Sequence, residues 1–195
     1  MNFVRTTAIA AIAITSASAA ANAQSANFTL ANDDLAVDVI LQQMTDGVQI
    51  NLIVDQPATG NYADLRGLFF DIDQTNLLSG LGVTGSDVTG FDFGGNVTSL
   101  GNGNTMSPAS FDAGVALGTS GASPDFIGST SFLLTGLDLD NLLGQRFGLR
   151  ATSVGTDPTG DLNDGSVKLL GTSSVPEPAS LGLLGLAALA LTRRR

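Results

Sequence analysis

The feature that most constrains this fold is the recurrence of apolar residues at every second position in two runs within residues 35–54. Apolar side chains occupy every second position on both sides of Thr45-Asp46-Gly47, first at Leu35, Val37, Val39 and Leu41 and then at Val48, Ile50, Leu52 and Val54. A period of two places such side chains on one face of a strand. The Asp-Gly step between the two runs is a turn signal. The pattern therefore predicts a β-hairpin with one apolar face.

The rest of the chain between residues 24 and 174 reads as short strands separated by turns. Clusters of Gly, Asn, Ser, Thr and Asp divide apolar segments at residues 68–72, 91–93, 115–117, 126–134, 147–154 and 167–170. Short strands at such spacing are typical of antiparallel sandwiches. We therefore predict a mainly β fold, an antiparallel β-sandwich or jelly-roll-like body. Residues 77–80 and 141–144 are expected to form single helical turns, and residues 172–178 a linker.

Residues 1–23 have the organisation of a secretory signal peptide. Arg5 supplies a positive charge, residues 8–14 are apolar, and Ala21-Asn22-Ala23 is a small-x-small cleavage site before Gln24. We expect this segment to form a signal helix, to engage a Sec-type export machinery and to be removed before Gln24.

The composition of the body, residues 24–174, limits its chemistry. It holds seventeen Asp against Arg66, Arg146, Arg150 and Lys168, a net formal charge of −13. Such a surface repels nucleic acid and anionic lipid. The chain has no Cys and no His, so disulfides and the usual nucleophile–base arrangements are absent. Two pairs of aspartates, Asp71 with Asp73 and Asp138 with Asp140, are each predicted to share one face of a strand. The sequence does not single out a catalytic pair among the seventeen aspartates, and we expect no enzymatic activity.

Residues 175–195 have three parts in a fixed order. Pro176-Glu177-Pro178 is followed by the apolar run 181–191, and then by Arg193, Arg194 and Arg195. The prolines keep the first part extended. The apolar run gives a helix of about 16 Å, short against a hydrocarbon core of about 30 Å. We expect a transmembrane helix that relies on local thinning and arginine snorkelling. The arginines act as a membrane stop on the cytoplasmic side and leave the body on the opposite face.

This tail resembles the PEP-CTERM protein-sorting signal, which is also known as an ice-binding protein C-terminal domain. All three parts of the signal are present in Val175–Arg195. The resemblance implies recognition by exosortase, a membrane transpeptidase of Gram-negative bacteria that make exopolysaccharide. It further implies that the protein crosses the inner membrane, loses its tail and passes to the cell envelope or extracellular matrix.

One loop of the body is a candidate metal site. Asp157, Asp161, Asn163 and Asp164 crowd a short segment that ends in Gly165. Calcium binds six to eight oxygens, and such loops supply them. The spacing does not match the EF-hand loop, because the glycine comes one position early and no glutamate follows. The alternative is that these aspartates serve turn formation and solubility.

The sequence thus leads to one main function and two alternatives. The main expectation is an exported envelope or matrix protein with a structural or interaction role and no cofactor. The first alternative is a calcium- or glycan-binding β-sandwich adhesin, with exopolysaccharide as a partner. The second is an aspartate-dependent polysaccharide hydrolase. Aromatic platforms for sugars are scarce, since the chain has no Trp and Tyr62 is its only tyrosine.

Overall fold

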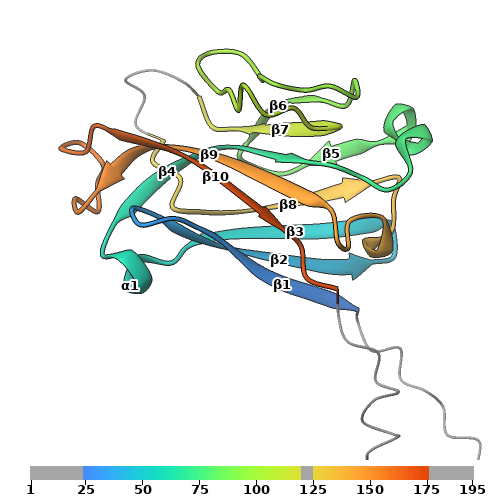
Figure 1. Cartoon of the computed structure of the whole chain (residues 1–195), viewed down its shortest axis with the longest axis horizontal. Coiled ribbons are helices and arrows are strands. Elements are labelled where there is room, and N and C mark those ends of the chain that lie inside the picture. The colour runs from blue at the N-terminus through green and yellow to red at the C-terminus, as the bar shows by residue number, and fades with distance from the viewer. Residues whose placement is uncertain (1–23, 120–124, 176–195) are drawn as a thin grey trace, which may run out of the picture.

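The computed structural model describes residues 24–119 and 125–175, and these form two facing antiparallel sheets of five strands each (Figure 1). Sheet A contains, in spatial order, β1 (Ser25–Ala31), β2 (Ala36–Met44), β3 (Gly47–Val54), β8 (Ser129–Thr135) and β5 (Gly82–Thr84). Sheet B contains β10 (Gly165–Thr172), β9 (Arg146–Gly155), β4 (Tyr62–Phe70), β7 (Ala113–Leu117) and β6 (Val88–Asp92). The predicted mainly β, two-layer architecture is confirmed for these residues.

The predicted hairpin is strands β2 and β3. The strands pair antiparallel from Val37 opposite Val54 to Met44 opposite Gly47, and Thr45-Asp46 forms the turn. Gly47 is required there, because its φ is +149° and an added Cβ would lie 2.1 Å from the carbonyl oxygen of Leu134. The alternation in the sequence thus corresponds to a strand pair with one face in the core and the other face directed toward solvent.

The main core lies between the two sheets. It is built from the inward positions of the strands, and Phe70, Phe132 and Phe147 are among its largest fully buried side chains. The rings of Phe70 and Phe147 stack with centroids 6.0 Å apart. Burying an aromatic side chain of this size contributes a large part of the stabilisation of such a core.

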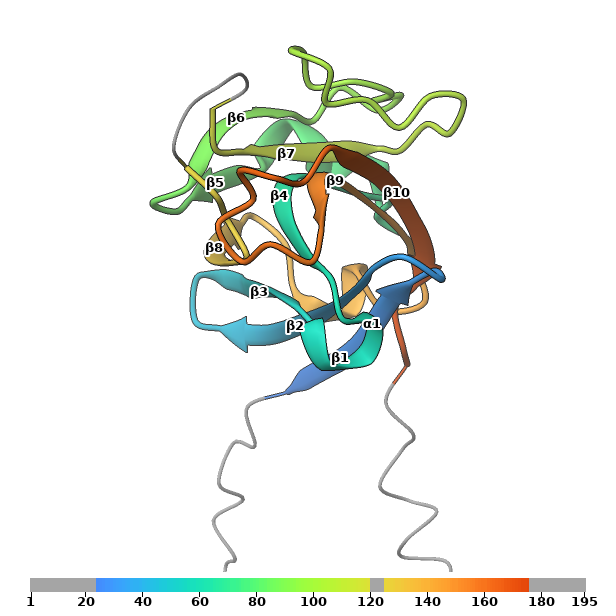
Figure 2. The same ribbon diagram turned by 90° about the vertical axis from the view of Figure 1, so that its left-hand side faces the viewer.

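A second, smaller core lies on the outer face of sheet B. The segment 93–112 leaves β6 and folds back over that face before it enters β7, as Figure 2 shows above β7 and β9. Phe69 points outward from β4 and is buried there with Val97, Met106 and Phe111. Gly148 permits this contact, because an added Cβ would lie 2.6 Å from the ring of Phe111. The central strand β4 of sheet B is therefore covered on both faces.

Several expected strand limits are corrected by the structure. β8 begins at Ser129 rather than at residue 126, and β1 was not expected at all. Asp71 and Asp73 follow the end of β4 and do not share a strand face. The expected linker at residues 172–178 begins later, because β10 runs to Thr172 and Ser173 is buried.

Only short helical turns occur among the described residues. They are α1 (Gln56–Thr59), η1 (Thr75–Gly80) and η2 (Leu139–Asn141). The turn expected at residues 77–80 is part of η1, whereas the one expected at 141–144 lies slightly earlier, in η2. None of the helices in the described part of the chain is long and apolar enough to cross a membrane. The predicted signal helix and tail helix lie outside the described residues.

Candidate functional site

The start and the end of the described chain are fixed side by side on the body. The carbonyl of Gln24 accepts a hydrogen bond from the backbone N–H of Gln43 at 2.9 Å, which extends the pairing of β1 with β2 by one residue. Near the other end, the hydroxyl of Ser174 donates to the carbonyl of Asn27 at 3.0 Å. Figure 1 shows the start of β1 next to the end of β10. Both junctions with the predicted processed segments therefore lie at one corner of the sandwich.

The C-terminal junction is anchored by Ser173. Its side chain is buried, its hydroxyl donates to the carbonyl of Leu142, and its backbone N–H donates to the carbonyl of Gln145 at 3.0 Å. The backbone N–H of Gln145 returns a hydrogen bond to the Ser173 hydroxyl at 3.2 Å. Val175 follows with 65% of its surface exposed. The change from anchored to exposed chain thus falls immediately before Pro176.

Of the predicted site residues at the two junctions, only Gln24 belongs to the described part of the chain. Ala21 and Ala23 of the signal cleavage site are outside the described residues, and Gln24 is the first described one. The sorting motif Pro176, Glu177 and Pro178 and the membrane stop Arg193, Arg194 and Arg195 are also outside them. The structure therefore describes the platform from which both segments leave.

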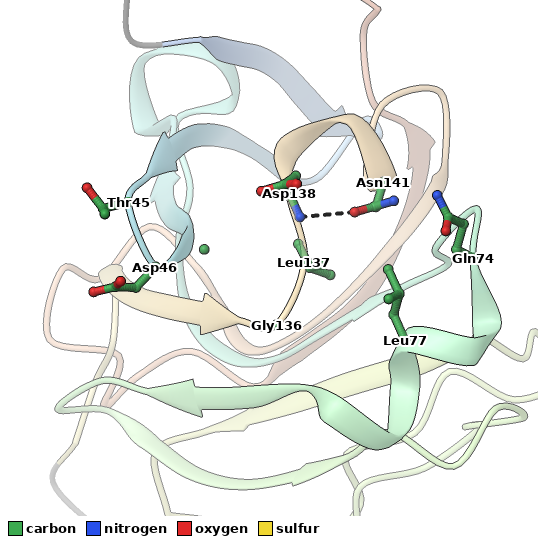
Figure 3. A pocket seen from close by; sticks show the side chains of 9 residues that line it. Thr45, Asp46, Gln74, Leu77, Gly136, Leu137, Asp138 and Asn141 are labelled. Carbon is green, nitrogen blue, oxygen red and sulfur yellow. Dashed lines mark hydrogen bonds between the residues drawn. The ribbon is translucent and has the colours of Figure 1, made fainter.

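A polar pocket of about 420 Å³ opens at the same end of the sandwich (Figure 3). The β2–β3 turn with Asp46, η1 with Leu77, and η2 with Asp138 and Asn141 line it. The backbone N–H of Asp138 donates to Oδ1 of Asn141 at 3.0 Å, as the dashed line in Figure 3 marks. The two side chains form a reciprocal capping box, which starts this short helix.

The helical turn η2 connects this pocket with the junctions. Asp138 and Asn141 line the pocket, whereas Oδ1 of Asp140 accepts a hydrogen bond from the side chain of Gln24 at 3.0 Å. The sequence pattern had placed Asp138 and Asp140 on one face of a strand, and that prediction is wrong because the segment is helical. The pocket lining has two carboxylates and no basic side chain. Two carboxylates without a basic partner disfavour the binding of an anion here.

The loop predicted as a calcium site uses its side chains for its own hydrogen bonds. The carboxylate of Asp157 accepts from the backbone N–H groups of Thr159 and Leu162, each at 3.0 Å. The side chain of Asn163 bonds the backbone N–H and carbonyl of Asp157 at 3.1 and 2.8 Å. These N–H donors, that of Thr159 first, lower the pKa of Asp157 below its usual range.

The other two residues of that loop do not complete a ligand set. Asp161 and Asp164 are exposed. In residues 24–119 and 125–175, no three acidic side chains gather closely enough to hold a metal ion. The geometry supports the turn-forming alternative for this loop, and calcium binding stays a prediction.

Sequence reasoning missed a buried polar cluster in sheet B. Arg66 and Asp64 of β4 form an ion pair of 3.2 Å, and both side chains are largely buried. Oδ1 of Asp64 also accepts the backbone N–H of Ile127 at 3.1 Å. Burial raises the pKa of Asp64. No sequence signal marks this pair, because an Asp and an Arg two residues apart usually lie on an exposed strand face.

A second pocket, of about 250 Å³, lies beside Arg66 on the outer side of sheet B. Asn104 of the 93–112 segment lines it and donates to the carbonyl of Arg66 at 2.6 Å. Oδ1 of Asn104 is buried and has no hydrogen-bond partner, a position that suits a bound water. The cluster therefore ties the covering segment to β4.

Comparisons with known proteins leave the body without a relative. No curated protein matches this chain, and no solved structure matches it. One family model does match, and it covers the segment that leaves the anchored corner of the body. Residues 174–195 match the PEP-CTERM protein-sorting motif, which supports an exported protein sorted by an exosortase.

Proposed function

We propose that the body, residues 24–174, acts in the cell envelope or extracellular matrix as a structural or interaction protein. In this proposal the chain enters the export pathway through residues 1–23. An exosortase then removes the tail beyond the Pro176-Glu177-Pro178 motif. The body that remains carries out the structural or interaction role, which needs no catalytic group.

The observation that carries this proposal is where the motif begins. The family match starts at Ser174, and the last strand ends at Thr172. Ser173 and Ser174 hold the last described residues on the body through their hydroxyl groups. Loss of the chain from Pro176 onward therefore removes none of the described strands and no described core residue. A fold that is complete without its sorting tail suits a substrate that is cleaved and passed on.

The proposal of a non-catalytic role rests on chemistry. The chain has no Cys and no His for nucleophilic or general-base roles. The buried carboxylate Asp64 is engaged by Arg66 and by the backbone of Ile127. In the pocket of Figure 3, Asp138 is committed to capping η2. These groups have structural partners, which supports a binding or structural role.

The experiment replaces Pro176-Glu177-Pro178 by three alanines in a host that contains exosortase. The exported wild-type protein is expected to lack Arg195 in its intact mass, whereas the variant retains it and stays in the membrane fraction. Pro158→Ala, in an exposed loop of the body, is the control and should be processed like the wild type. Retention of Arg195 by the wild type, or tail loss in a strain without exosortase, would contradict the proposal.

A further inference from the structure

The outer face of sheet A carries almost no charge, in a molecule that is otherwise strongly acidic. Asp38 is the only charged residue within the five strands of this sheet. The four basic residues of the body all lie on strands of sheet B. Most aspartates lie in turns and loops. The body thus has a net charge of −13 and one broad surface that hardly contributes to it.

We define this neutral face by its outward side chains. In the registered strand pairs, Asn27, Ile40, Asn51 and Ser131 lie side by side across β1, β2, β3 and β8. The next outward row across the same strands is Ser25, Gln42, Gln49 and Leu133. Ile53 and Met44, on the same face, are 44% and 43% exposed. The neutral face therefore mixes amide and hydroxyl groups with accessible apolar side chains.

No described element covers the neutral face, whereas the 93–112 segment covers the outer face of sheet B (Figure 2). The polar groups on the neutral face are ordered by mutual contacts. Gln49 donates to the hydroxyl of Ser131, which donates to Oδ1 of Asn51 at 2.7 Å. Asp38 accepts the hydroxyl of Thr29 at 2.7 Å. The face is thus a pre-organised surface with few side chains left to order on binding.

We propose that the neutral face is a self-association surface, on which a second copy of this chain packs face to face. Two copies with a charge of −13 each repel one another wherever their acidic loops meet. The neutral face adds little to this repulsion, because Asp38 is the only charged residue within its strands. Symmetric dimers use the same patch on both partners, and two sheet faces pack about 10 Å apart.

The composition of the face favours a protein over a polysaccharide partner. Its outward rows contain no aromatic ring against which a sugar ring would stack. The apolar groups of Ile40, Ile53 and Met44 instead offer surface that gains from leaving water. Their neighbours are neutral amides and hydroxyls, which pair with the same groups on a second copy.

The central residue Asn51 provides the test. Asn51→Asp keeps an oxygen that accepts the Ser131 hydroxyl and adds one negative charge to each copy. Like charges placed against each other in an interface are unfavourable, so the dissociation constant of the dimer should rise at least about tenfold. Asn76→Asp makes the same change at an exposed position of η1 and should leave the dissociation constant unchanged.

The measurement is sedimentation velocity over a range of concentrations, on protein isolated from the cells that make it. We expect a concentration-dependent dimer in the wild type. The Asn51→Asp effect should shrink in about 1 M salt, where the screening length falls to about 3 Å, whereas a folding defect would not. A wild type that is monomeric throughout, or a dimer that Asn51→Asp does not weaken, overturns the proposal. The comparison of Asn51→Asp with Asn76→Asp isolates the neutral face, because both variants keep the same tail.

The absence of cysteine from the chain allows a second measurement that locates the contact. A single Ser131→Cys variant on the neutral face should form a disulfide-linked dimer under mild oxidation. Ser79→Cys, an exposed control in η1, should remain uncross-linked. Equal cross-linking of the two variants would show random collision and would contradict a specific interface.

Discussion

Arg66 donates from Nη1 to Oδ2 of Asp64 at 3.2 Å, and both residues belong to the same strand, β4. The register between β4 and β9 shifts between Leu65 and Gly67, so Arg66 occupies an irregular position in the ladder. The side chains are only 10% and 12% exposed. A charge pair this buried is costly to break, because the remaining partner keeps its desolvation penalty.

Arg66→Ala is therefore expected to lower the free energy of unfolding by about 3–5 kcal/mol at neutral pH. Burial already raises the pKa of Asp64 in the folded state, and loss of the guanidinium raises it further. Protonation of Asp64 then favours the folded form as pH falls, so the loss should be smaller near about pH 4.5 than at pH 7. Urea unfolding at the two pH values measures this. An equal loss at both would show that Arg66 acts only by packing.

Phe69→Ala tests whether the segment 93–112 is held by the second core. Phe69 is fully buried against Phe111, with ring centroids 5.9 Å apart. Truncation of such a side chain costs about 3–5 kcal/mol. Phe91→Ala is the matched control, because Phe91 is 58% exposed and should lose less than about 1 kcal/mol. Denaturant unfolding compares the two, and equal losses would contradict the assignment of a second core.

Ser173→Ala tests the anchoring of the chain end. The substitution removes the hydroxyl that joins Leu142 and Gln145 and leaves these two backbone groups only their long mutual hydrogen bond of 3.4 Å. We expect a loss of about 1–3 kcal/mol. Ser174→Ala removes one exposed hydrogen bond and should cost less than about 0.5 kcal/mol. Thermal unfolding of the two variants separates these cases. If both lose the same amount, the end of the body is not fixed through Ser173.

Asp157 is expected to contribute to acid sensitivity. The backbone N–H groups of Thr159 and Leu162 lower the pKa of its carboxyl in the folded state. The resulting stabilisation is present above the usual Asp pKa of about 3.9 and is lost as pH falls below it. Asp157→Asn should flatten the fall in stability between about pH 4 and pH 2. Acid titration of the melting temperature of both proteins measures this, and parallel curves would exclude the effect.

The same loop yields an expectation about calcium. Asp157 and Asn163 are already bonded within the loop, so calcium should raise the melting temperature no more than magnesium does at the same ionic strength. Both cations should stabilise the body modestly by screening its negative charge. A rise of several degrees with calcium alone, abolished by Asp161→Ala, would instead establish the calcium site that the sequence pattern indicates.

The sequence predicted those parts of the fold that rest on a regular period. Strands β2 and β3 carry apolar residues at every second position over most of their length, and the expected face of each is buried. Strand β1 was missed although Ala26, Phe28 and Leu30 also alternate. Its seven residues follow directly on the signal segment, and the pattern there is short. β5, with three residues, is too short to show a period.

The features that escaped prediction depend on contacts between distant segments. Phe69 appeared to be the outward residue of an alternating strand, and nothing local shows that Phe111 would cover it. Arg66 and Asp64 are buried by tertiary packing, whereas sequence reasoning treats such a pair as exposed. The predicted calcium residues did fall in one loop, but their spacing could not show that Asp157 and Asn163 bond each other.

Because Gln24 and Ser174 lie at the same corner, the body can be joined there and opened elsewhere. A chain whose ends meet at one corner is nearly a closed loop, and such folds tolerate circular permutation. A short flexible link between these ends, with new ends opened at the exposed turn of Asp33 and Asp34, would leave all strand pairings in place. The three-dimensional structure therefore does not require the natural order of the strands along the chain. That order instead attaches the predicted signal segment and the sorting tail at a single point of the body.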